Sequence, residues 1–174
     1  MINLMNTVLS WLTLSSHILL ILFLIFLTIY PIKKVKKHTK KLVLHVRSHA
    51  IKYAFVVATT ATLGSLFYSE IAGFTPCLLC WWQRIFMYVL PIILLVAIIY
   101  KDYKVRRYTI PLATIGALIS IYHIMVQLTP TFTCIGQGGV DCGLTYVLGF
   151  GYITIPIMSL TAFVMIIILS YIQK

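Results

Sequence analysis

Charged residues are scarce in this 174-residue chain, and acidic residues are the scarcest of them. Asp, Glu, Lys and Arg together make up 10% of the sequence, and only three of these residues are acidic. Hydrophobic residues make up 61%, and the mean hydropathy is +1.01. A soluble domain carries about 25% charged residues, so this composition excludes a soluble protein. The net charge of +11 falls in short runs between apolar segments, which indicates orientation in a bilayer and not nucleic-acid binding.

Five apolar segments have the length that a helix needs to cross about 30 Å of hydrocarbon. They cover residues 8–30, 51–70, 81–100, 108–128 and 152–172, and none has Asp or Lys near its middle. Backbone groups in lipid must pair internally, so we expect each segment to be helical. The sequence predicts an all-α membrane protein, with a four-helix transmembrane bundle at 49–174. An extra N-terminal transmembrane helix and a basic cytoplasmic linker precede the bundle, at 1–48.

The first apolar segment is interpreted as a retained span and not as a signal peptide. No Lys or Arg precedes it, the apolar run is too long, and no small-x-small cleavage site follows. The basic run from Lys33 to Lys41 is expected to touch anionic lipid headgroups. The histidines of this region, His38, His45 and His49, are expected to have no catalytic role.

The basic residues predict the orientation of the chain. Thirteen of the 14 Lys and Arg residues lie between the first and second segments, between the third and fourth, or at the C-terminus, which leaves Arg84 alone on the other side. The positive-inside rule places these basic regions in the cytoplasm, the N-terminus outside and the C-terminus inside. All four cysteines then face the extracytoplasmic side, where disulfides are tolerated.

A Cys-x-x-Cys pair, Cys77 and Cys80, stands where the third apolar segment begins. Pro76 suits the first turn of a helix at this point. The unpaired N–H groups at a helix N-terminus stabilise a thiolate, which is the reactive form of cysteine. Arg84 is four residues beyond Cys80 on the same helix face, where it favours the thiolate and an anionic electron acceptor. An arginine within a span is by default a functional hypothesis, and snorkelling to the headgroups is the alternative.

Two polar residues of the fourth segment, His123 and Gln127, are also four positions apart. Their depth is comparable to that of Arg84, so the three side chains can line one polar pocket facing Cys80. For His123 alone, an interhelical hydrogen bond is the simpler interpretation. Glu70, at the outer end of the second segment, is expected to serve packing or solvation.

The second cysteine pair, Cys134 and Cys142, encloses seven residues in the outer loop, three of which are glycine. Such a ring can close into a disulfide and still move. A structural disulfide is one alternative for this pair. A Cys₄ zinc site is another, but the Cys-x₇-Cys spacing fits zinc poorly and the oxidising face opposes it.

Three features of the chain resemble the DsbB/BdbC family of disulfide-bond formation proteins. These are Cys-Leu-Leu-Cys-Trp-Trp-Gln-Arg at 77–84, Tyr-His-x-x-x-Gln at 122–127, and the later pair Cys134 and Cys142. The resemblance covers residues 50–174, and the short second loop is closer to the BdbC type. The first span and its lysine run depart from the four-helix pattern of the family.

The resemblance implies a thiol-disulfide oxidoreductase that transfers electrons from a protein dithiol to a membrane quinone, with menaquinone as the expected type. Its partner would be a thioredoxin-like thiol oxidase of the DsbA/BdbD kind. The Cys134–Cys142 disulfide would accept electrons from that partner, with Cys134 attacked first. The Cys77–Cys80 pair would then pass them on to a quinone held by Arg84, His123 and Gln127. The alternatives are a quinone reductase of the vitamin K epoxide reductase kind and a non-catalytic, disulfide-stapled accessory protein.

Overall fold

The structure is a computed structural model that describes residues 2–29, 33–129, 134 and 140–173. The side chains of 27–29 and 33–38 are outside this description, and so are Lys174 and the loop glycines Gly136, Gly138 and Gly139. The described residues form five α-helices and one π-helical turn, joined by loops. They are α1 (Ile2–Ile29), α2 (Lys33–Leu66), the turn η1 (Phe67–Ile71), α3 (Leu78–Tyr100), α4 (Arg106–Leu128) and α5 (Ile155–Ile172).

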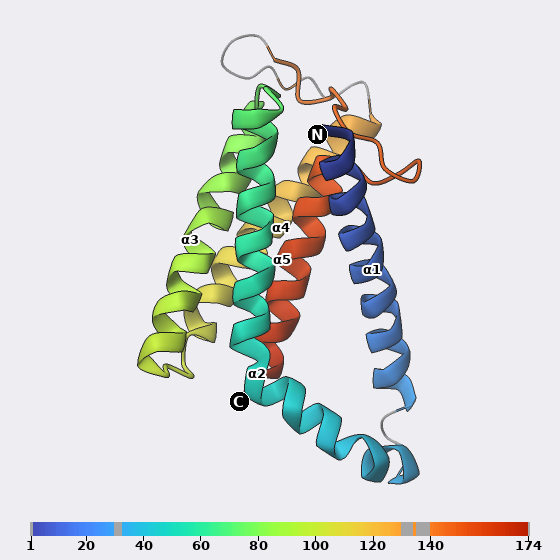
Figure 1. Cartoon of the computed structure of the whole chain (residues 1–174), viewed down its shortest axis with the longest axis vertical. Coiled ribbons are helices and arrows are strands. Elements are labelled where there is room, and N and C mark those ends of the chain that lie inside the picture. Colours follow the sequence, from blue (N-terminus) through green and yellow to red (C-terminus); the bar gives the residue numbers. More distant parts are fainter. Residues whose placement is uncertain (1, 30–32, 130–133, 135–139, 174) are drawn as a thin grey trace.

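Within the described residues, all five α-helices are long and apolar enough to cross a membrane. This confirms the predicted fold class. Helices α2 to α5 pack against one another as a bundle, and α1 lies along its side, next to α5 (Figure 1). The protein is therefore a multi-pass membrane protein whose N-terminal helix is an addition to a four-helix core.

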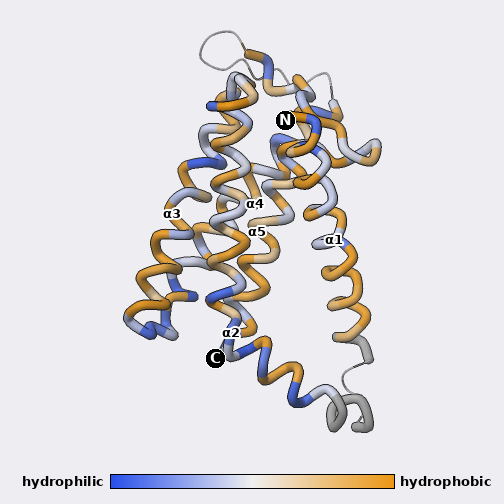
Figure 2. Tube along the Cα trace, viewed as in Figure 1, coloured by the Kyte–Doolittle hydropathy of each residue, from blue (hydrophilic) through white to orange (hydrophobic). Residues whose placement is uncertain are grey.

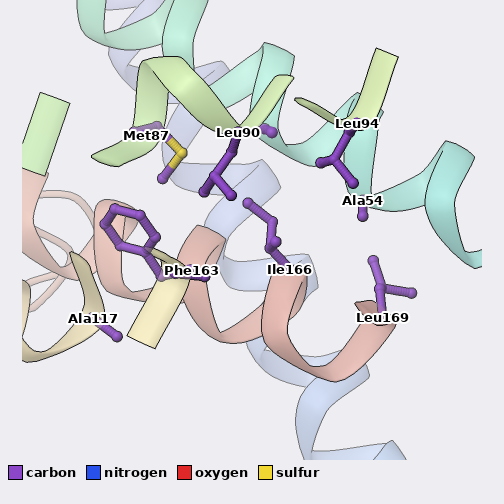
Figure 3. Packing of buried hydrophobic residues seen from close by; sticks show 10 residues of the cluster. Ala54, Met87, Leu90, Leu94, Ala117, Phe163, Ile166 and Leu169 are labelled. Carbon is purple, nitrogen blue, oxygen red and sulfur yellow. The ribbon is translucent and has the colours of Figure 1, made fainter. Parts of the chain in front are cut away.

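The centre of the bundle is filled by apolar side chains from all four of its helices. Figure 3 shows Ala54 of α2, Leu90 and Leu94 of α3, Ala117 of α4, and Phe163 of α5 meeting there. These side chains are 8% exposed or less. Gly116 of α4 makes this close packing possible, because a Cβ at that position would clash with the Phe163 ring.

The two ends of the bundle differ in chemistry. The N-terminus and the loop that carries Cys134 and Cys142 lie at one end (Figure 1). The C-terminus and the α3–α4 turn lie at the other end, where hydrophilic residues gather (Figure 2). The basic residues of that turn are therefore separated from the cysteines by the length of the bundle, which is the arrangement that the charge pattern predicts.

The helix bounds differ from the predicted ones in ways that have local causes. Helix α2 begins at Lys33, so the basic segment predicted as a linker is helical. Helix α3 begins at Leu78 with Cys77 as its N-cap, which leaves Pro76 outside the helix and not in its first turn. Helix α5 begins at Ile155, three residues late, because Gly149 and Ile153 pair across a tight turn just before it.

Candidate thiol redox site

The N-terminus of α3 places the first cysteine pair. Cys77 has an extended backbone, and its carbonyl oxygen accepts the first helical hydrogen bond from the N–H of Trp81. No side chain caps this end of the helix, so the positive end of the helix dipole acts directly on the two thiols. Cys77 is 4% exposed and Cys80 is partly buried. Both are free thiols, and their Sγ atoms lie 3.3 Å apart.

His123 of α4 connects Cys77 to the second cysteine pair. The Nε2 atom of His123 lies 3.7 Å from Cys77 Sγ and 3.0 Å from the carbonyl oxygen of Cys142. The ring is 2% exposed. Cys77 and Cys142 belong to the same buried cluster, together with Leu79 and Val126. The two cysteine pairs are therefore neighbours at one end of the bundle, with a histidine between them.

Gln83 determines which nitrogen of His123 carries the hydrogen. Its amide nitrogen is 2.9 Å from Nδ1 of the ring, and an amide nitrogen can only donate. Nδ1 must therefore accept, which leaves the hydrogen on Nε2, facing Cys77 and Cys142. Gln83 is 6% exposed, so this bond lies in a water-poor region where an unpaired partner would be costly. His123 is therefore oriented so that its Nε2–H group faces Cys77 and Cys142.

The surroundings of Cys77 favour its thiolate. The pKa of Cys77 is lowered from 9.0 to about 4. The largest cause is the hydrogen bond between the two thiols, because the Cys80 thiol can donate to Cys77 once that residue has lost its proton. Burial opposes the thiolate, and the hydrogen bond from His123 favours it. These contacts therefore stabilise the thiolate of Cys77 when the pair is reduced.

A long apolar slot opens on the other side of Cys80. It has a volume of about 290 Å³ and is lined by residues of α1, α2, α3 and α5, including Cys80, Gln83 and Arg84. The guanidinium of Arg84 donates from Nε to the hydroxyl and from a second nitrogen to the carbonyl oxygen of Ser65, each over 3.0 Å. It also lies 5.4 Å from the centre of the Trp81 ring. The slot thus has one fixed positive charge, next to a thiol.

The predicted polar pocket of Arg84, His123 and Gln127 is divided in two by the structure. Arg84 faces the slot, whereas His123 and Gln127 line a much smaller cavity of about 20 Å³ with Cys77 and Cys142. Cys80 borders both spaces. The division arises because Arg84 is on the face of α3 that meets α2, and His123 reaches the face that meets α4.

Gln127 connects the outer loop to the bundle. Its amide nitrogen donates to the carbonyl oxygen of Leu144 over 3.3 Å, and its amide oxygen accepts from the Thr154 hydroxyl over 3.0 Å. Thr154 is the N-cap of α5. These contacts hold the segment after Cys142 against α4 and α5.

Cys134 and Cys142 form a disulfide in this structure, with their Cα atoms 5.3 Å apart. The backbone N–H of Cys142 also donates to the carbonyl oxygen of Cys134 over 2.9 Å. Cys142 is 1% exposed, whereas Cys134 is partly exposed. The accessible sulfur of this pair is therefore that of Cys134, and the sulfur of Cys142 faces inward.

Two residues of the site were not assigned a role from the sequence. Gln83 enters the sequence analysis only as part of the motif at 77–84, and Ser65 does not enter it. The sequence does offer a signal for a role of Gln83, because a polar amide within an apolar span, one residue before Arg84, needs a hydrogen-bond partner. Ser65 gives no such signal, because a single serine in a membrane helix commonly bonds its own backbone.

The ligand atoms of Cys77, Cys80 and His123 lie within 4.8 Å of one another. Two thiolates and an imidazole are ligands that suit a soft ion such as Zn²⁺. The hydrogen on Nε2 points to Cys142, however, so an ion would have to displace that hydrogen bond. The arrangement of these atoms fits thiol chemistry without a metal, and the absence of a metal remains a prediction.

A free dithiol beside a disulfide, at one end of a transmembrane bundle, defines a membrane thiol–disulfide exchange protein. The comparisons with known proteins give the same class. The sequence model of the family described as disulfide bond formation protein DsbB matches residues 47–173. The chain therefore belongs to the DsbB family, as the sequence motifs predicted, and its role lies in disulfide formation.

Two of the similar proteins come from Bacillus species. The chain is 43% identical over 128 residues to the probable disulfide formation protein C 1 of Bacillus anthracis, a match that covers 72% of this chain and 92% of the relative. It is 48% identical over 123 residues to the disulfide bond formation protein C of Bacillus subtilis, covering 70% and 89%. No solved structure gives a significant match.

Proposed function

We propose that the protein is a dithiol:quinone oxidoreductase that reoxidises a thioredoxin-like thiol oxidase outside the cell membrane. The observation that carries this proposal is the position of Cys80. Cys80 borders the slot that contains Arg84. Cys77, the other cysteine of the pair, borders the small cavity that contains His123 and Cys142. One cysteine pair therefore has access to a second disulfide on one side and to a ligand-sized space on the other.

The first exchange takes place at the outer loop. A thiolate of the partner attacks Cys134, the more accessible sulfur, and the bond to Cys142 breaks, so that Cys142 leaves as a thiolate. The second cysteine thiolate of the partner protein then attacks the partner's first sulfur, which is bound to Cys134 in the mixed disulfide, and Cys134 is released as a thiolate. The partner gains a disulfide, and the loop pair gains the two electrons.

The second exchange connects the loop to the helix pair when Cys77 and Cys80 are in their disulfide form. Cys142 is buried beside Cys77, so its thiolate attacks that sulfur and Cys80 leaves as a thiolate. Cys134 then attacks Cys142, which restores the loop disulfide and releases Cys77. His123 donates toward the sulfur of Cys77 and stabilises its thiolate as it forms.

The slot fits a quinone ring. Its volume of about 290 Å³ is close to the lower end of the ~300–1,000 Å³ typical of ligand pockets, and its walls are mostly apolar. A bound quinone supplies an acceptor for two electrons and two protons, which restores the Cys77–Cys80 disulfide. Arg84 contributes a positive charge where the ring oxygens gain negative charge. Menaquinone is the expected type.

The orientation of the chain is part of this proposal. The cysteines lie at the end of the bundle opposite the basic α3–α4 turn, and the positive-inside rule puts that turn in the cytoplasm (Figure 1). We assign residues 1–48 to the added helix and its basic extension, and residues 49–174 to the DsbB-like unit. Labelling of reduced intact cells with an impermeant maleimide should modify the cysteines, and labelling only after lysis would contradict this orientation.

The test of the function is quinone reduction by a reduced thioredoxin-like donor with the purified full-length protein. We expect menaquinone reduction that requires all four cysteines. A mixed disulfide between the donor and Cys134 should accumulate when the second, resolving cysteine of the donor is replaced by Ser, because the first thiolate still displaces Cys142 but nothing then releases Cys134. A protein that stays fully oxidised, forms no adduct and reduces no quinone would be the non-catalytic alternative. Net oxidation of hydroquinone would indicate the opposite direction.

A further inference from the structure

Helix α1, which lies outside the family match, forms one wall of the slot. The family match begins at residue 47, and the match to the Bacillus anthracis relative takes up 92% of that protein, which leaves little chain for a counterpart of α1. Four residues of α1 nevertheless border the slot. They are Leu9, Leu12, Thr13 and Ser16. The slot is therefore completed by an element that lies outside the family match.

The slot runs along the helices, with a polar end and an apolar end. On α2 it extends from Ser65, which holds Arg84, to Val56. Nine residues of helix correspond to about 13.5 Å. Ser65 holds Arg84 of α3 at the outer end, and the other α2 side chains along this length are small or apolar, with Val57 and Ala61 among them. The space has the shape of a ring site that continues into a channel for an apolar chain.

Helix α1 covers that channel along its length. The methyl carbons of Leu9 lie 3.4 Å from where position 64 of α2 would carry a Cβ, so Leu9 is level with the outer end of the slot. Helices α1 and α2 run in opposite directions, and Ser16 is seven residues, or about 10.5 Å, further inward. Ser16 is thus level with the region of Val57, at the apolar end.

Specific contacts fix α1 in this place. The two ring nitrogens of His17 pair with the Tyr152 hydroxyl over 3.0 Å and with the Thr161 hydroxyl over 2.8 Å. Ser10 packs against Gly149, where a Cβ would clash with the Ser10 hydroxyl. Beyond His17, apolar side chains such as Leu19 and Leu22 are more than half exposed. The half of α1 that borders the slot is therefore the half that is fastened to α5 and its preceding loop.

We propose that α1 is part of the electron-acceptor site, and that its Leu9–Ser16 face seats the isoprenoid tail of a quinone whose ring lies at Cys80 and Arg84. This inference rests on the proposed function. It makes α1 a determinant of specificity for the tail, and His17 the residue that positions α1. Without the wall the apolar channel would open to lipid, and the protein would distinguish less between tailed and tailless quinones.

Two adjacent serines of α1 offer a matched pair of variants. Ser15 and Ser16 both donate a hydrogen bond to the Leu12 carbonyl oxygen over 2.8 Å, but Ser16 borders the slot and Ser15 is exposed. Ser16→Phe should fill the inner end of the channel, and Ser15→Phe adds the same ring outside it. We expect Ser16→Phe to raise the KM for a prenylated naphthoquinone about tenfold, with less than a twofold change for a tailless naphthoquinone. Ser15→Phe should change neither.

The outcomes separate this inference from the proposed function. If the unmodified protein reduces no quinone, the proposed function fails. If it reduces both quinones and the two variants behave alike, α1 is not part of the acceptor site. A second measurement needs no variant: a naphthoquinone with a photoreactive group on its tail should label α1 between Leu9 and Ser16. Labelling confined to α2 and α5 would also overturn the inference.

Discussion

The two sides of the Cys77–Cys80 pair differ in every physical property that governs reactivity. On the Cys77 side, the cavity is about 20 Å³, the groups are buried, and His123 is fixed by Gln83. On the Cys80 side, the slot is about 290 Å³, mostly apolar, and has one cation. A tight polar side suits transfer between sulfurs that are already in the chain, and a wide apolar side suits an acceptor that enters from the lipid.

Helix α3 presents its two cysteines to different neighbours, so in the proposed function one dithiol serves two partners. Arg84 contributes only to the slot, and His123 only to the sulfur side. Replacing Arg84 should therefore leave exchange between the cysteine pairs intact, and replacing His123 should leave the slot intact.

The largest effect is expected from Cys77→Ser, which removes the sulfur that faces Cys142. Turnover with a reduced thioredoxin-like donor should fall at least about 1,000-fold, because Cys80 alone cannot form the disulfide that accepts electrons from the loop. Cys80 remains in the slot, so adding quinone should still change the absorbance of this variant. Substantial turnover would contradict the assigned order of electron transfer, and unchanged absorbance would argue against contact between Cys80 and quinone.

A smaller effect is expected from Arg84→Met, which removes the cation of the slot. The KM for quinone should rise about tenfold, because the ring oxygens lose a charged hydrogen-bond donor. Exchange between the two cysteine pairs, followed by thiol trapping, should keep its rate. Arg107→Met, at the exposed start of α4 on the opposite end of the bundle, is the matched control. An unchanged KM for Arg84→Met would remove Arg84 from the quinone site.

The smallest effect concerns the titration of Cys77 on the sulfur side. In the reduced protein its thiolate should persist down to about pH 4, because a lowered pKa means that the proton binds only at lower pH. Alkylation at Cys77, quantified by mass spectrometry of its peptide, should therefore change little between pH 8 and pH 5. His123→Phe should move the midpoint upward by about one pH unit, since a hydrogen-bond donor to the thiolate is lost.

The control for this titration is Arg84→Met, which acts on the other side and should leave the Cys77 midpoint in place. Cys80→Ala should move the midpoint further than His123→Phe does, because the hydrogen bond between the thiols is the largest cause of the lowered pKa. A midpoint near 9 in the unmodified protein would contradict the stabilisation of the Cys77 thiolate by Cys80 and His123.

Much of the fold could be predicted from hydropathy alone. The long apolar segments became α1 to α5, and the ends at Tyr100, Leu128 and Ile172 are those predicted. Helix starts were harder, because they depend on contacts between residues distant in sequence. The start of α5, for example, is delayed by the turn that pairs Gly149 with Ile153. The basic segment from Lys33 carried no apolar pattern, and it is helical as the first part of α2.

The candidate site, like the fold, was predictable where it depends on spacing within one helix and not where it depends on contacts between helices. The spacing of Cys77 and Cys80, and of Cys80 and Arg84, predicted that each pair would be close. The two thiols are 3.3 Å apart, and Cys80 and Arg84 both line the slot. The placement of His123 depended on how α4 packs against α3, and side chains at equal depth can face different spaces. The contact of Arg84 with Ser65 and the contact of Gln83 with His123 arise between helices, so neither follows from spacing within one segment.

The sequence by itself determined that this is a helical membrane protein, because bilayer thickness and the helical rise translate directly into runs of apolar residues, and it placed the four cysteines at one end. It also determined the family, through motifs that are local in the chain. Only the tertiary structure decided that Cys80 borders two separate spaces and that α1 closes one of them. Both facts depend on which faces of five similar apolar helices pack together. In lipid this packing is determined by small residues and single interhelical hydrogen bonds, which a hydropathy pattern does not reveal.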